Sequence, residues 1–102
     1  MSADPLLQPY RLKHLNLKNR VMSTAHEPAY SDDGLVGERY RLYHREKARG
    51  GIALTMTAGS ALVAPDSPAA FGNLQAYRDE IVPGLRRLAE DCHAEGCAVM
   101  IQ

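Results

Sequence analysis

The hydrophobic residues of the chain gather into three short runs that are separated by longer, more polar segments. The runs are Arg20–Thr24, Ile52–Thr57 and Ala98–Gln102. None of them alternates regularly between apolar and polar residues, which is typical of strands that are covered on both faces, as in a parallel sheet. We therefore expect three buried β-strands, with Val21 and Met22 on the inside of the first.

Two of the segments between these runs have the character of α-helices. Residues Glu38–Arg49 are rich in helix formers, and a Gly-Gly pair follows them, as a glycine C-cap would. The second helix is expected over residues 79–95, with Asp79 as its N-cap and Gly96 as its end. Four apolar residues of that helix recur at helical spacing: Ile81, Leu85, Leu88 and Cys92.

Two shorter motifs predict turns. The segment LKHLNLK, residues 12–18, is expected to form a small hairpin in which Leu12 and Leu17 flank a turn containing Asn16. The cluster SDDG, residues 31–34, combines residue types that favour tight turns. Both motifs precede the first predicted helix, one on each side of the first predicted strand.

The resulting order of strand, helix, strand, helix, strand predicts an α/β fold, either a (β/α)₈ TIM barrel or a doubly wound sheet. A nucleotide-binding doubly wound domain normally carries a Gly-x-Gly-x-x-Gly fingerprint after its first strand, and none follows Thr24, which favours the barrel. The chain ends at Gln102, directly after an apolar run that no helix covers. We therefore expect residues 1–102 to be the N-terminal part of a single truncated domain. They would form the first three βα steps of a barrel, preceded by a short N-terminal hairpin.

The overall composition argues against several classes of function. Twelve basic and twelve acidic residues give a formal net charge of zero, so there is no basic excess with which to bind nucleic acid. No apolar run approaches the roughly 20 residues of a membrane-spanning helix, and the first ten residues lack the pattern of a secretory signal. The spacing of Cys92 and Cys97 fits neither a zinc knuckle nor a redox pair. We expect buried, reduced thiols and a cytoplasmic protein.

The ends of the three predicted strands carry the candidate chemistry. Each strand changes from apolar to small or amide-bearing residues at its carboxyl end: Ser23–His26, Thr57–Ser60 and Gln102. For a single strand, such a change also marks the start of an ordinary loop. In both parallel architectures, however, the carboxyl ends of the strands meet at one edge, and ligands bind there. The agreement of all three strands predicts a ligand site at this edge.

Metal and nucleophile sites are weaker alternatives. The pair His26-Glu27 lacks a second histidine four positions after the first, and Pro28 prevents the helix that a His-Glu-x-x-His zinc site requires. Ser23 and Thr24 are nucleophiles in principle, but no activating partner can be assigned to them from the sequence. The other histidines are expected to be structural or solvent-exposed: His14, His44 and His93.

Beyond these physical arguments, the sequence resembles the old yellow enzyme family of FMN-dependent NADH:flavin oxidoreductases. The resemblance begins with PLLQPYRLKHLNLKNRVMSTAH, in which a proline–leucine opening and a hairpin lead through Leu-Lys-Asn-Arg into the first strand. It continues in order through ERYRLYHREKARGG, TMTAGSALV, NLQAYRD, IVPGLRRLAEDCHAEG and the final VMIQ. The segment around EPAYSDDG is similar to the branch of the family that includes dienoyl-CoA reductases, trimethylamine dehydrogenase and N-methylproline demethylases.

The resemblance implies where the cofactor would lie. In the family, the end of the first strand lies along the isoalloxazine ring of FMN, which here implies four consecutive residues: Ser23, Thr24, Ala25 and His26. The small residue after the second strand, Ala58, would let the ring pack closely. The amide of Gln102 on the third strand would hydrogen-bond the pyrimidine part of the ring. His26 would tune the flavin or contact substrate; Thr24 and His26 stand where many relatives carry a proline and a cysteine or threonine.

The same resemblance implies an activity. A nicotinamide (NADH or NADPH) or an oxidisable amine would give hydride to FMN, and a small-molecule acceptor would then take the electrons. The substrate-binding pair, the proton donor, the FMN phosphate site and any iron–sulfur cluster would lie beyond Gln102. Residues 1–102 alone are therefore expected to be inactive and to bind FMN poorly. A homo-oligomer is compatible with the full-length protein.

The strand and helix pattern alone also fits a rival interpretation. A non-flavin α/β-barrel enzyme such as a lyase, or a non-catalytic assembly module, would show the same pattern, because one fold hosts many functions. The colour of the purified full-length protein separates these interpretations, as does the presence of a histidine pair on strands that follow Gln102.

Overall fold

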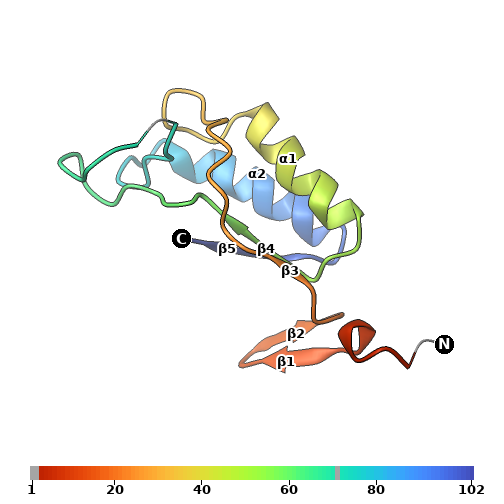
Figure 1. Ribbon diagram of the computed structural model, residues 1–102. Coiled ribbons are helices and arrows are strands. Elements are labelled where there is room, and N and C mark those ends of the chain that lie inside the picture. The colour runs from red at the N-terminus through yellow and green to blue at the C-terminus, as the bar shows by residue number, and fades with distance from the viewer. Residues whose placement is uncertain (1–2, 71) are drawn as a thin grey trace.

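The computed structural model of the chain describes residues 3–70 and 72–102 (Figure 1). These residues form a small antiparallel hairpin, a three-stranded parallel sheet and two α-helices. Neither helix in the described ranges has the length and apolar character needed to cross a membrane. In chain order, the elements are a 3₁₀ turn at Pro5–Leu7, β1 (Tyr10–Leu12), β2 (Leu15–Leu17), β3 (Met22–Ser23), α1 (Glu38–Arg49), β4 (Leu54–Thr57), α2 (Ile81–His93) and β5 (Ala98–Ile101).

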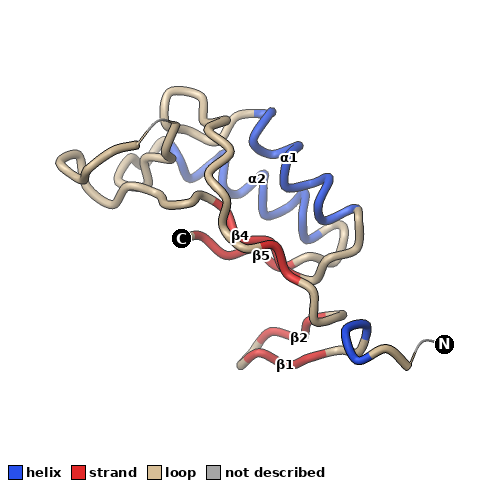
Figure 2. Tube along the Cα trace, viewed as in Figure 1, coloured by secondary structure: helices blue, strands red, loops and turns tan. Residues whose placement is uncertain are grey.

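The parallel sheet has the strand order β3–β4–β5, so each strand pairs with the next one along the chain. Ser23 lies opposite Thr55, and Thr57 lies opposite Ile101. Both helices lie on the same side of this sheet, and the hairpin lies beyond the amino-terminal end of β3 (Figures 1 and 2). The predicted order of strand, helix, strand, helix, strand is thereby confirmed. The described residues hold two complete βα units and a third strand.

The hydrophobic core lies between the helices and the sheet. Helices α1 and α2 pack against each other, α1 against β4 and α2 against β5. The buried apolar residues come from both helices, the loops beside them and the ends of the strands: Val36, Tyr40, Ala48, Ala58, Leu74, Ile81, Leu88, Cys92 and Cys97. Both cysteines are free and buried, as predicted, and burial raises the pKa of Cys92 to about 11. The Cys92 thiol therefore stays protonated and acts as a packing group.

The first helix has the predicted bounds, but the second begins later than predicted. Helix α2 starts at Ile81, and its N-cap is Glu80, which makes no side-chain hydrogen bond to the helix. The prediction of Asp79 as the N-cap is therefore wrong. The reason is that carbonyls of the preceding turn already accept the first free N–H groups: the N–H of Ile81 donates to Arg78 O, and that of Val82 donates to Asp79 O, both at 3.1 Å.

The hairpin forms as predicted, but its turn lies elsewhere. Asn16 is the middle residue of β2, and the chain reverses at residues 13–14 instead. Lys13 takes the left-handed backbone conformation, with φ of 53°, which is frequent in two-residue hairpin loops. Pairing between apolar side chains sets this register. The register brings together two such pairs: Leu12 with Leu15, and Tyr10 with Leu17.

The first parallel strand is shorter and more exposed than predicted. Strand β3 contains only Met22 and Ser23, and Val21 and Met22 have exposed fractions of 37% and 46%. Strand β3 is an edge strand, and the hairpin nearest to it leaves an open groove over these two side chains. The predicted burial of Val21 and Met22 is therefore wrong for the part of the chain that the structure describes.

Candidate functional site

The carboxyl-terminal ends of β3, β4 and β5 lie at one edge of the sheet, as expected for parallel strands. The ends of β4 and β5 are bonded to each other: the N–H of Gln102 donates to Thr57 O (3.2 Å), and the N–H of Ala61 donates to Gln102 O (2.8 Å). The loops that follow β3 and β4, described over residues 24–37 and over 58–70 and 72–80, lie side by side beyond this edge (Figure 1), and the N–H of Gln75 donates to Gly34 O (2.8 Å). The structure thus brings the strand ends that carry the predicted site residues into one region.

Three of the predicted site residues present exposed side chains here: Thr24, His26 and Gln102. Ala25, between the first two, is half-buried. The Nδ1 atom of His26 lies 2.8 Å from the carbonyl oxygen of Thr24. Because a carbonyl only accepts hydrogen bonds, Nδ1 carries the proton in the neutral ring, and Nε2 is left as an acceptor.

The other two candidate strand ends, at Ser23 and Ala58, are held from the helix layer by α1. Lys47 Nζ donates to Ser23 Oγ, and the N–H of Ala58 donates to Tyr40 Oη, both at 2.8 Å. Ala58 has no exposed surface and a left-handed backbone with φ of 65°, which is uncommon for a residue other than glycine. Burial raises the pKa of Tyr40 to about 12, so its hydroxyl stays protonated. A buried phenol therefore holds this strained corner in place.

A third contact from α1 is made by His44, which lies between Tyr40 and Lys47 on the helix. His44 Nδ1 lies 2.8 Å from Thr55 Oγ1. Burial, and to a smaller extent the Lys47 ammonium, lowers the pKa of His44 to about 4, so the ring is neutral at pH 7. His44 Nε2 and Thr57 Oγ1 are buried without a hydrogen-bond partner among the described residues. The face that α1 turns to the sheet is therefore polar, and uncharged at its centre.

Two side chains join the loops that follow β3 and β4. The carboxylate of Glu27 accepts from Asn73 Nδ2 (3.2 Å) and from the N–H of Ala29 (3.1 Å). Asn73 Nδ2 also donates to Ser60 O (2.8 Å), and Asn73 Oδ1 accepts from the N–H of Ala70 (2.6 Å). These bonds fix the loops to each other next to the strand ends.

Three residues of this region were not identified by sequence reasoning: Tyr40, Lys47 and Asn73. Glu27 was considered beside His26 as part of a metal site, and not as a link between loops. The spacing of Tyr40, His44 and Lys47 places them on neighbouring turns of one helix face, which is a signal in the sequence. His44 was expected to be structural or solvent-exposed, and no role was assigned to Tyr40; the structure shows both residues fully buried. Glu27 and Asn73 lie 46 positions apart, and no local pattern links them.

The chemistry available at this edge is binding rather than nucleophilic attack. Ser23 Oγ receives a hydrogen bond from the Lys47 ammonium and donates to the Thr24 carbonyl at 3.4 Å, so no base activates it. The described residues contain no cluster of three or more His, Cys, Asp or Glu side chains that could hold a metal ion. What remains are exposed hydroxyl, imidazole and amide groups beside a small residue.

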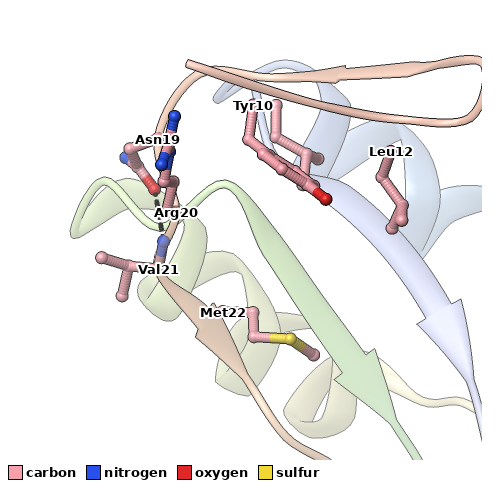
Figure 3. A pocket seen from close by; sticks show the side chains of 7 residues that line it. Tyr10, Leu12, Asn19, Arg20, Val21 and Met22 are labelled. Carbon is pink, nitrogen blue, oxygen red and sulfur yellow. Dashed lines mark hydrogen bonds between the residues drawn. The ribbon is translucent and has the colours of Figure 1, made fainter. Parts of the chain in front are cut away.

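A groove of about 290 Å³ lies at the opposite, amino-terminal end of the sheet, between the hairpin and β3 (Figure 3). Its lining is mainly apolar: Tyr10, Leu12, Leu17, Asn19, Arg20, Val21 and Met22. Its Asn19 and Arg20 side chains already have partners within the chain. The N–H of Val21 donates to Asn19 Oδ1 (3.0 Å), and the Arg20 guanidinium lies 5.5 Å from the centre of the Tyr10 ring. None of the six predicted site residues lines this groove.

Comparison of the sequence with known proteins identifies relatives over nearly all of the chain. The NADH:flavin oxidoreductase / NADH oxidase family matches residues 5–102. A protein of Rhizobium meliloti (strain 1021) named probable N-methylproline demethylase is 63% identical over 102 residues, 100% of this chain. The multifunctional alkene reductase/demethylase OYE of Caballeronia cordobensis is 52% identical over 101 residues, 99% of this chain. The chain spans 15% of the length of each of these curated relatives.

Solved structures show the same fold. The complex of 2-naphthoyl-CoA reductase with 2-naphthoyl-CoA matches 95% of this chain with a TM-score of 0.88 at 26% identity, and the match covers 15% of that protein. Morphinone reductase in complex with tetrahydroNAD matches 97% of this chain with a TM-score of 0.85 at 21% identity, over 26% of its own length. The fold is therefore that of a part of a TIM barrel, and the doubly wound alternative is set aside.

Proposed function

The chain belongs to the NADH:flavin oxidoreductase / NADH oxidase family, and from this we propose that the protein containing it is an FMN-dependent oxidoreductase of the old yellow enzyme type. The family match over residues 5–102 is the observation that carries the proposal. The family match and these relatives favour a flavin enzyme over the rival interpretation as a non-flavin lyase or an assembly module, which the fold alone does not separate. Because the chain spans only 15% of these relatives, the activity of the whole protein is part of the proposal.

Within that protein, residues 1–102 are proposed to be the N-terminal part of one FMN-binding (β/α)₈ domain. Strands β3, β4 and β5 are then its first three barrel strands, and α1 and α2 are the helices that follow the first two. The hairpin precedes the first strand. The consecutive strand order, with both helices on one side of the sheet, supports this assignment (Figure 1).

The exposed residues at the strand ends fit a flat, polar ring such as the isoalloxazine of FMN. Thr24, His26 and Gln102 offer hydroxyl, imidazole and amide groups, and Ala25 leaves room beside them. We assign Thr24, Ala25 and His26 to one side of the ring and the Gln102 amide to its pyrimidine part. When bound, FMN supplies the hydride acceptor and donor, while these residues orient it and hydrogen-bond its polar atoms.

We propose that Ser23 and Ala58 contribute to the site through backbone and small size rather than through polar side chains, because both are hydrogen-bonded to side chains of α1. The hydroxyl of Ser23 is engaged by Lys47 in the helix layer, so Ser23 offers its backbone to the ring. Ala58 is fully buried, and its small side chain keeps the corner after β4 thin enough for the ring to pack closely against the neighbouring backbone. The hydrogen bond to Tyr40 fixes the direction of that corner.

A small N-methylated amine is the substrate class that we favour. The relatives at 63% and 52% identity are named N-methylproline demethylase and alkene reductase/demethylase. The free Nε2 of His26 is an acceptor that can contact a substrate ammonium or the flavin edge. Reduction of an alkene with electrons from NADH or NADPH is the second candidate, because the Caballeronia cordobensis relative is also named an alkene reductase.

The remaining partners and the location are proposed from composition and packing. Zero formal net charge argues against a nucleic-acid partner. The two free, buried thiols support a cytoplasmic location, and they leave any iron–sulfur cluster to other parts of the protein. A small-molecule substrate is the principal partner, and a homo-oligomer of the full-length protein is compatible with the proposal.

Spectroscopy of the purified full-length protein tests the proposal. We expect flavin absorbance, release of FMN on denaturation, and anaerobic bleaching by N-methylproline or by NADPH. The compound that bleaches the flavin separates amine oxidation from alkene reduction. A colourless protein that takes up no FMN contradicts the proposal. For residues 1–102 alone, we expect no stoichiometric binding in an FMN titration, because the proposed phosphate site lies on other strands of the barrel.

A further inference from the structure

The loops that follow β3 and β4 are joined by two side chains that are not among the proposed flavin contacts. We refer to Glu27 and Asn73, with the hydrogen bonds between and around them, as the Glu27–Asn73 clasp. The exposed fraction of Asn73 is 8%, and its oxygen and nitrogen both have partners in fixed directions. Because the N–H of Ala70 can only donate, it identifies the Asn73 oxygen and so fixes the orientation of the amide.

The clasp joins two stretches of backbone that have no room to shift toward each other. A Cβ atom added to Gly59 would lie 2.5 Å from the backbone nitrogen of Glu27 and 2.8 Å from its Cα. A Cβ atom added to Gly72 would lie 2.6 Å from the Cα of Ala29. The two loops therefore touch through backbone on both sides of the Glu27 side chain, and the side-chain bonds fix their register.

We propose that Glu27 and Asn73 are positioning residues, which set the place of His26 relative to the corner formed by Ala58–Ser60. The inference rests on the proposed function. Glu27 directly follows His26, and Asn73 bonds the carbonyl of Ser60 at the end of that corner. One carboxylate–amide contact thus links the end of β3 to the end of β4. Displacing a reacting or orienting group by about 1 Å can lower a rate by roughly a hundredfold.

The pattern of donors and acceptors predicts how the clasp responds to substitution. Asn73→Asp keeps the shape but removes both N–H donors and places a carboxylate against Glu27 and the Ser60 carbonyl. Glu27→Gln keeps the shape but turns a donor toward the Asn73 amide. In the double variant, the amide at position 27 donates to the carboxylate at position 73 and its oxygen accepts from Ala29, so the contact between these two residues is restored with reversed polarity. The Ser60 carbonyl still lacks its donor.

The experiment compares the full-length, FMN-loaded protein with these variants. We expect each single variant to shift the visible flavin spectrum and to lower kcat by about tenfold or more, with a smaller change in KM. The double variant should recover the part of the loss that comes from the contact between residues 27 and 73, and so be faster than Asn73→Asp. Asn16→Asp makes the same chemical change at an exposed position of the hairpin, and it should behave as the wild type.

Two results would overturn the inference: single variants with the wild-type spectrum and kcat, or a double variant no faster than Asn73→Asp. A purely structural role would lower the melting temperature without moving the spectrum of the protein that remains folded. If Asn73→Asp does not fold, Glu27→Gln decides the matter by the same measurements. A colourless wild-type protein removes the proposed function itself, whereas a yellow wild type with unaffected variants removes only the clasp.

Discussion

The two ends of the parallel sheet are built in contrasting ways. At the carboxyl-terminal end, hydrogen bonds join separate loops, and exposed polar side chains stand beside a small residue. At the amino-terminal end, an apolar groove of about 290 Å³ lies between the hairpin and β3 (Figure 3). A hollow of about 250 Å³ at the carboxyl-terminal end is similar in volume, but its lining is more polar and includes Asp33, Asn73 and Gln75. Ligand sites combine an apolar lining with a few polar groups in fixed positions, and more such polar groups are exposed at the carboxyl-terminal end.

The cause of this contrast is the direction of the strands. Long loops leave the carboxyl ends of β3 and β4, and they are free to be shaped by contacts such as those of Glu27 and Asn73. Only short connections enter β4 and β5, at residues 50–53 and 94–97, and they serve mainly to end the preceding helix. The candidate site residues therefore lie at the carboxyl end, where the active sites of TIM barrels are found.

The largest effect is expected from Gly59→Ala at the carboxyl-terminal end. The added methyl group would lie 2.5 Å from the Glu27 backbone nitrogen, and forcing the two loops apart should cost on the order of 3 kcal/mol. Chemical denaturation of the full-length protein, together with its FMN content, measures both consequences. Gly50→Ala is the matched control, because Gly50 ends α1 in a right-handed conformation that alanine adopts readily. Equal losses of unfolding free energy and of FMN content in the two variants would contradict the proposed difference between the two ends of the sheet.

Acidification should weaken the part of the sheet that α1 supports. The folded chain holds the pKa of His44 at about 4, below its ordinary 6.5, so between these values only the unfolded chain takes up the proton. The contribution of neutral His44 to the free energy of unfolding is therefore fully present above pH 6.5. It falls as the pH drops toward 4, where the loss reaches about 3 kcal/mol. The unfolding free energy of wild type and His44→Asn, measured across this range, should differ in slope.

The control for this pH dependence is His14→Asn in the hairpin. His14 is exposed, so its replacement should leave the pH dependence of the wild type in place. Loss of the slope in His14→Asn, or its retention in His44→Asn, would show that another group titrates. The comparison also tests whether the buried face of α1, rather than the hairpin, responds to acid.

A smaller effect is expected from Tyr40→Phe. The substitution leaves the buried N–H of Ala58 without its acceptor, which should cost about 1–3 kcal/mol and shift the flavin spectrum of the full-length protein. Tyr43→Phe is the control on the same helix, because Tyr43 contacts His44 and Lys47 through its ring. Its melting temperature should stay close to that of the wild type. A silent Tyr40→Phe variant would mean that the corner after β4 needs no support from α1.

Most of the fold could be predicted from the sequence, because local periodicity determines it. Helix α1 ends where the run of helix formers meets the Gly-Gly pair, and the apolar stripe of α2 is buried at Ile81, Leu88 and Cys92. The predictions failed where a contact with another part of the chain determines the local structure. Pairing with β1 draws Asn16 into a strand, and the backbone of the preceding turn replaces Asp79 as a cap.

The candidate site could be predicted less completely, for the same reason. The strand ends are visible as the points where apolar runs stop, but the layer that a side chain faces depends on register and on the neighbouring helix. Ser23 is bonded by Lys47, 24 positions later, and Glu27 by Asn73, 46 positions later. Neither contact has a periodic signature. The assignment of the six residues to FMN stays a prediction.

The smallest effect is expected at the amino-terminal end, from Val21→Thr. Val21 is 37% exposed beside the apolar groove, and the substitution preserves its shape, so the free energy of unfolding should change by less than about 1 kcal/mol. The flavin spectrum and kcat of the full-length protein should not change, because the Val21 side chain lies beside the groove at the opposite end of the sheet from the proposed site. A spectral shift as large as that of Tyr40→Phe would mean that the groove is coupled to the site. In that case the apolar groove and the carboxyl-terminal strand ends would be coupled, and the two ends of the sheet would not have separate roles.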